Sequence, residues 1–127
     1  MQDRPENAIT WAVIGAAISV HRELGPGLLE SAYEACLAHE FNILGLRYER
    51  QLPLPIEYKG LKLDCGYRMD FVVDDNVVIE LKVADSISPV HEAQCLTYLR
   101  FSRKHICLLL NFNVLLMKDG IKRYVLD

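Results

Sequence analysis

The segment from Gly66 to Lys82, GYRMDFVVDDNVVIELK, constrains the fold of this chain most, because its pattern is typical of a β-hairpin. Apolar, largely β-branched residues stand on both sides of Asp74–Asn76, whose composition favours a tight turn. With this loop, the alternation of strand side chains predicts that Asp70 faces Glu80 across the pair and that Lys82 shares their face. The apolar residues of both strands then line the opposite face.

Two carboxylates in this relation should repel each other, since side chains directly opposite in an antiparallel pair are only about 5 Å apart at Cβ. A hard divalent cation such as Mg²⁺ or Mn²⁺ would relieve the repulsion, and the neighbouring lysine could serve a polarised water or a phosphate. The same residues also fit an ordinary solvated face of a sheet. The hairpin alone leaves both interpretations open.

Length and composition indicate one domain over residues 1–127, because 51% of its 127 residues are hydrophobic and can form a core without disulfides. No apolar run is long enough to span a membrane, and Asp3, Arg4 and Glu6 stand where a signal peptide would need a different pattern. We therefore expect a cytoplasmic protein with no membrane partner. The four cysteines form no Cys-x-x-Cys pair, so we expect them to be reduced and structural.

The net charge of −3 argues against a protein that holds nucleic acid mainly by electrostatic attraction. It does not exclude a nuclease, because acidic metal ligands contribute to that negative count. The basic residues among 100–105 could contact phosphates or interact with the end of a helix, and the sequence leaves both readings open. The four histidines are scattered and are expected at the surface or at helix ends, not in a metal pair.

The remaining pattern predicts helices and strands in a regular order. Helices are expected over residues 5–24, 28–44 and 88–103, with Gly45 ending the second and Ser88-Pro89 starting the third. An edge strand interrupted by proline is expected within residues 46–58, and a buried strand over 105–112. A closing hairpin is expected from 114–117 and 121–126 around Lys118–Gly120. This order predicts an α/β fold, a three-layer αβα sandwich with a central mixed β-sheet.

Three sets of residues resemble known motifs. Asp70, followed after nine residues by Glu80-Leu81-Lys82, resembles the PD-(D/E)XK nuclease signature. Gly66-x-x-x-Asp70 and Gln94-x-x-x-Tyr98 are similar to flanking motifs in the nuclease domains of bacterial recombination helicase–nucleases. Gly27-x-x-Glu30-x-x-Tyr33 is similar to the signature of the small bacterial GxxExxY proteins. The resemblance covers nearly the whole chain and implies a restriction endonuclease-like core.

The resemblance also implies roles for individual residues. Catalytic residues would be Glu30, Asp70, Glu80 and Lys82. Asp70, Glu80 and Glu30 would hold Mg²⁺, with Mn²⁺ as a second fitting ion, and the Leu81 carbonyl could add a ligand. Lys82 would orient or deprotonate the attacking water and stabilise charge on the phosphate. Gln94 and Tyr98 share one helix face and would contact the phosphate or the catalytic groups, although packing explains them equally well.

The expected function is therefore that of a Mg²⁺-dependent nuclease, which hydrolyses phosphodiester bonds of nucleic acid, DNA in the first place, through a metal-activated water. A catalytically inactive nuclease-fold module that binds nucleic acid or protein is the alternative, motivated by the low positive charge. Hydrolysis of a small nucleotide is a third reading. Edge strands leave a homo-oligomer open.

Overall fold

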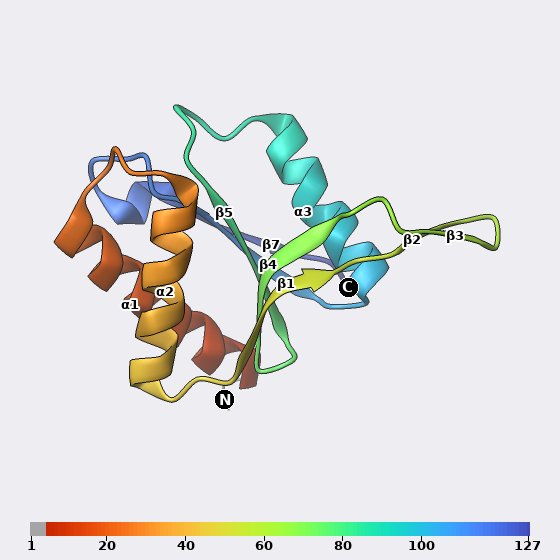
Figure 1. The fold of residues 1–127 in the computed structure, drawn as a ribbon, viewed down its shortest axis with the longest axis horizontal. Helices are drawn as coiled ribbons and strands as arrows, with labels where there is room; N and C mark the ends of the chain where they lie inside the picture. Colours follow the sequence, from red (N-terminus) through yellow and green to blue (C-terminus); the bar gives the residue numbers. More distant parts are fainter. Residues whose placement is uncertain (1–4) are drawn as a thin grey trace.

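The computed structural model describes residues 5–127 and places five strands in one mixed sheet with the order β1-β4-β5-β6-β7 (Figure 1). Its strands are β1 (Tyr48–Pro53), β4 (Arg68–Val73), β5 (Val77–Lys82), β6 (Ile106–Asn111) and β7 (Ile121–Val125). β5 and β6 are parallel, and the other neighbours are antiparallel. The predicted α/β fold with a mixed sheet is thus confirmed, and the strand interrupted by proline is at the edge as expected.

Helices cover both faces of this sheet. α1 (Pro5–Leu24) and α2 (Glu30–Leu44) lie on one face, and α3 (Pro89–Ser102) lies on the other (Figure 1). Side chains of β6 alternate between the two layers: Leu108 packs in the core below α1 and α2, whereas Leu109 packs in the core below α3. This alternation explains why β6 is almost wholly apolar in sequence, because both of its faces are buried.

Local sequence signals set several boundaries correctly. Asp74–Asn76 form the predicted turn between β4 and β5, and with this turn Phe71 pairs with Ile79. Gly45 adopts φ 69° at the end of α2. Ser88 caps α3 with Pro89 in the first turn, and the side chain of His91 completes a capping box with the Ser88 backbone. The second helix begins at Glu30, two residues later than expected.

One expectation about the order of elements was wrong. Residues 114–117 form no strand, and Lys118–Gly120 belong to the 3₁₀ helix η1 (Met117–Gly120) instead of a hairpin turn. Gly120 is required there by space, since an added Cβ would lie 2.0 Å from the Asn111 carbonyl oxygen. His21 lies in the last turn of α1, at a helix end as expected, where it is buried and its Nε2 lies 2.7 Å from the Val114 carbonyl oxygen. The four cysteines are free, and Cys65 is exposed, whereas Cys95 and Cys107 are buried.

A short hairpin leaves the main sheet between β1 and β4. Its strands β2 (Ile56–Tyr58) and β3 (Leu61–Leu63) pair only with each other and are joined by Lys59 and Gly60, both with positive φ. Figure 1 shows this hairpin, which we call the β2–β3 arm, projecting beyond the sheet on the side of α3. β3 is therefore not a continuation of β4.

None of the helices within residues 5–127 is long and apolar enough to cross a membrane. Asp3 and Arg4, which contributed to the expectation of no signal peptide, lie outside the described residues.

Candidate active site

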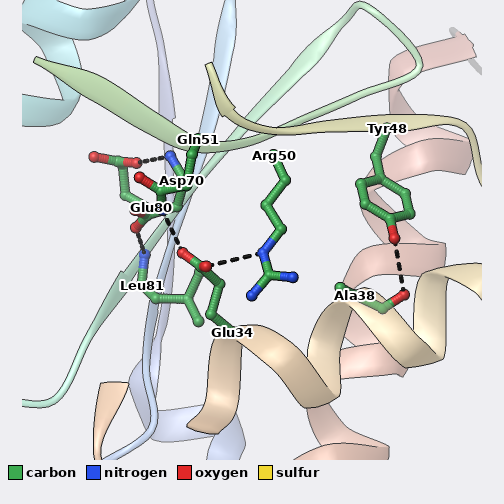
Figure 2. Close-up of polar contacts among 8 residues, drawn as sticks. All are labelled: Glu34, Ala38, Tyr48, Arg50, Gln51, Asp70, Glu80 and Leu81. Atoms are coloured by element: carbon green, nitrogen blue, oxygen red, sulfur yellow. Dashed lines mark hydrogen bonds and ion pairs between the residues drawn. The ribbon is translucent and has the colours of Figure 1, made fainter. Parts of the chain in front are cut away.

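The ladder between β4 and β5 opens where the two acidic residues of the signature stand. Backbone pairing runs from Val73–Val77 to Phe71–Ile79 and stops before Asp70. Beyond that point each carboxylate accepts a hydrogen bond from the opposite strand: Asp70 N–H donates to Glu80 Oε2 at 2.9 Å, and Leu81 N–H donates to Asp70 Oδ2 at 2.8 Å (Figure 2). The two carboxylates are thereby held at the open end of the sheet.

The alternation of side chains is interrupted at the same place. Phe71 packs in the core below α1 and α2, and strict alternation would put Met69 there as well. Met69 packs instead in the core on the α3 side. The side chains of β4 therefore stop alternating at Asp70, and the strand is irregular at this residue.

Gln51 and Glu34 link Asp70 to α2, and sequence reasoning missed both. The β1–β4 pairing skips Gln51 and Asp70. The Gln51 side chain instead donates through Nε2 to Asp70 Oδ1 at 3.2 Å and also to Glu34 Oε1 (Figure 2). Arg50 Nε donates to Glu34 Oε2 at 2.9 Å. Glu34 could have been found one turn after Glu30 on the same helix. Gln51 adopts φ 55°, and nothing in its residue type signals such a conformation.

Glu30 is the first residue of α2, and the loop before it is fixed by Tyr33. The Tyr33 hydroxyl donates to the Gly25 carbonyl oxygen at 2.6 Å and accepts from Leu28 N–H at 3.2 Å. Its ring is fully buried and stacks on Phe112 with centroids 4.6 Å apart. Tyr33 of the Gly-x-x-Glu-x-x-Tyr pattern thus holds the loop through which the chain enters α2, and so sets where Glu30 stands.

The carboxyl groups of this site resist ionisation. Burial, followed by the nearby charge of Asp70, raises the pKa of Glu80 to about 9. Burial also raises the pKa of Asp70, against the opposing effect of the Leu81 N–H hydrogen bond. The pKa of Glu30 is raised by partial removal from water and then by the charge of Asp70. Burial is the main cause in all three groups, so a positive charge placed among them would favour their ionised forms.

Lys82 is the cation that these three carboxyl groups share. Against the burial that raises each pKa, its ammonium group lowers the pKa of Glu30, of Asp70 and of Glu80. The side chain is half-buried at the last residue of β5, where Lys82 pairs with Asn111 of β6. Its charge therefore acts on all three acids from one position.

Gln94 and Tyr98 lie together on α3. Gln94 Nε2 donates to the Tyr98 hydroxyl oxygen at 3.0 Å. Burial, followed by the charge of Glu80, raises the pKa of Tyr98, so its ring lies within the electrostatic reach of the acids. This pair approaches the carboxylates from the α3 side, whereas Gln51 and Glu34 approach Asp70 from the α2 side.

The chemistry of the donor set suits a hard divalent cation. Asp70 and Glu80 offer carboxylate oxygens, and Glu80 Oε1 accepts no hydrogen bond from a described residue yet is not fully buried. Such an ion would favour the ionised forms of the carboxyl groups whose pKa values burial raises. Within residues 5–127, however, no three His, Cys, Asp or Glu side chains are already arranged as a metal cluster. Glu30 forms no hydrogen bond with Asp70 or Glu80, and only the effect of the Asp70 charge on its pKa links it to them.

Comparison with known proteins gives one finding about this chain's relatives. The family model described as the PD-(D/E)XK nuclease superfamily matches residues 7–124. Neither the curated proteins nor the solved structures gave a significant match.

Proposed function

Because the chain belongs to the PD-(D/E)XK nuclease superfamily, we propose that it is a metal-dependent nuclease that hydrolyses phosphodiester bonds of DNA. Asp70, Glu80 and Glu30 hold the ion in this proposal, with Mg²⁺ as the first choice and Mn²⁺ as the second. The observation that carries it is the position of Lys82, whose charge acts on all three of these carboxyl groups. Lys82 forms no ion pair with a described residue, so its ammonium group is not committed to another carboxylate.

In this proposal, different residues of the site have different roles in the reaction. A divalent ion, when bound, would supply Lewis acidity to a phosphate oxygen and to water. Lys82 would orient the attacking water and stabilise the negative charge that develops on the phosphate. The amide of Gln94 and the hydroxyl of Tyr98 can hydrogen-bond a phosphate oxygen. Gln51 would keep the Asp70 carboxylate in place through its bond to Glu34.

We further propose that the chain is one of the GxxExxY proteins and that residues 1–127 form one nuclease domain. The role of Tyr33 supports this placement, because it gives the motif a physical purpose. Tyr33 fixes the loop through its hydroxyl group, and Gly27 allows the loop conformation because it adopts φ 102°. Glu30 follows as the first residue of α2.

The direct test is hydrolysis of end-labelled single- and double-stranded DNA and RNA with Mg²⁺, with Mn²⁺ and with EDTA. We expect cleavage of DNA with either ion, none with EDTA, and loss of cleavage in Asp70→Asn. Asp119→Asn, at an exposed carboxylate of η1, is the matched control and should cleave normally. Stable binding without cleavage of any polymer would favour the inactive module, and cleavage of mononucleotides alone would favour a small substrate. Full activity of Asp70→Asn would remove the proposed site.

Metal affinity should rise with pH. Glu80, with a pKa of about 9, carries its proton at neutral pH in the metal-free protein, and a cation must displace that proton to bind. We therefore expect the Mg²⁺ affinity to increase up to about tenfold per pH unit between pH 6 and 9, and then to level off. Calorimetry in buffers of different ionisation enthalpy should also detect release of about one proton at pH 7.5. Constant affinity across this range would contradict the assignment of Glu80 as a ligand.

A further inference from the structure

A groove lies between the β2–β3 arm and α3. Its volume is about 270 Å³, and it is bounded by side chains of both elements, chiefly Ile56, Leu63, Tyr67, Gln94, Tyr98 and Phe101. On the arm, Ile56 pairs with Leu63, so the two side chains present one apolar face. On α3, the residues at 94, 98 and 101 lie on one side of the helix, which forms the opposite wall.

Aromatic rings give this groove its character. Tyr67 is 47% exposed, although it belongs to a wall that is otherwise apolar. Phe101 is half-buried on α3, and Tyr98 contributes its ring with a hydroxyl bonded to Gln94. Exposed aromatic rings beside an apolar slot suit the flat face of an unpaired base, which stacks on such rings whatever its identity.

The segments that line the groove are positively charged, in contrast with the rest of the chain. Residues 56–68 and 94–104 carry six basic and two acidic side chains, a net charge of +4, although the whole chain has −3. The acidic residues are Glu57 and Asp64, and the basic ones are Lys59, Lys62, Arg68, Arg100, Arg103 and Lys104. Lys104 is paired with Asp75 at 2.9 Å, and no other basic residue of the two segments forms an ion pair within residues 5–127. This charge complements a phosphate backbone.

The groove also leads to the acids. Gln94 and Tyr98 form part of its wall, and Tyr98 lies within the electrostatic reach of Glu80 and Asp70. A strand whose bases occupy the groove would therefore run with its backbone toward the carboxylates. In a duplex the base faces are already stacked on one another, so paired bases cannot enter.

We infer that this groove binds unpaired bases, stacked on Tyr67 and Phe101, so that the substrate is a single-stranded segment of nucleic acid. The inference rests on the proposed function, because it selects among the polymers that the site could cleave. An apolar peptide is the competing occupant of such a groove, and the experiment below separates the two.

The test is fluorescence anisotropy of a labelled single-stranded DNA oligonucleotide, and of the matching duplex, in the Asp70→Asn background with Ca²⁺. We expect the single strand to bind more tightly than the duplex, and Tyr67→Ala to weaken single-strand binding by roughly 5- to 100-fold. Tyr67→Phe should bind the single strand as tightly as the protein that keeps Tyr67, since phenylalanine retains the stacking ring. Trp11→Ala removes an equally large exposed ring from α1, at 73% exposure, and should change nothing.

If Tyr67→Ala binds the single strand as tightly as the protein that keeps Tyr67, or if the duplex binds more tightly, the inference is overturned and a peptide is favoured as the occupant of the groove. This failure is distinct from failure of the proposed function. Single-strand binding that depends on Tyr67, in a wild-type protein that cleaves nothing, would support the groove and reject the nuclease. Cleavage of single strands with a KM unaffected by Tyr67→Ala would reject the groove and leave the nuclease in place.

Discussion

Replacing Glu80 by glutamine is expected to stabilise the metal-free protein at pH 8 and, at the same time, to reduce Mg²⁺-dependent hydrolysis by roughly 10²- to 10³-fold. Glu80 is only 3% exposed, and its pKa of about 9 in the folded protein lies far above the ordinary 4.5. The folded state therefore binds more protons than the unfolded state between these values, so stability falls as pH rises from about 4.5 to about 9. Glutamine has the same shape and can still accept from Asp70 N–H, but it has no proton to lose.

The expected gain in unfolding free energy is about 1–3 kcal/mol at pH 8 and close to zero at pH 4. Urea unfolding with EDTA at several pH values would measure it, and calorimetry with Mg²⁺ would measure the accompanying loss of metal affinity. Glu49→Gln, at an exposed position of β1, is the control and should show neither effect. A glutamine variant that is destabilised at every pH would show that Glu80 is structural and not a strained metal ligand.

The sequence predicted the parts of the fold that depend on local chemistry. Ser88 with Pro89, Gly45, and the Asp74–Asn76 turn each determine a backbone conformation through their own side chains or lack of one, and the structure has them where expected. The apolar run of β6 was equally clear, because a strand covered by helices on both faces has no polar side.

The errors arose where distant parts of the chain decide the conformation. Asp119-Gly120 favours a hairpin turn by residue type, but Gly120 packs against the Asn111 backbone and the segment forms a 3₁₀ helix. The β2–β3 arm has strands of three residues, too short for alternation to be recognised.

The candidate site was predictable to the same extent. The turn fixed the register as far as Phe71 and Ile79, and so predicted that Asp70 and Glu80 lie near each other, although backbone pairing stops before them. Glu34 and Gln51 reach Asp70 through the placement of α2 and β1 against β4, which no local pattern encodes. The crossed hydrogen bonds between the two acids and the opposite strands were also unforeseen, because a regular hairpin would have paired Asp70 with Glu80 directly.

Lys82→Met should separate catalysis from metal binding. Methionine keeps the length and apolar stem of lysine but removes the charge that acts on Glu30, Asp70 and Glu80. We expect kcat to fall by roughly 10²- to 10³-fold, since the variant can no longer orient the attacking water or stabilise charge on the phosphate. Mg²⁺ binding at pH 9 should persist, because the variant has lost an ammonium group that would repel Mg²⁺ near the same carboxylates.

Lys82→Met should thus lose hydrolysis but keep metal binding, whereas Glu80→Gln should lose both. Calorimetry with Mg²⁺ and single-turnover cleavage of one DNA substrate, carried out on both variants, would compare them directly, with Lys118→Met on exposed η1 as the control for loss of a lysine. If Lys82→Met loses metal binding in parallel with hydrolysis, the lysine only keeps the acids ionised. If it retains full kcat, Lys82 takes no part in the chemistry, and the proposal loses the observation that carries it.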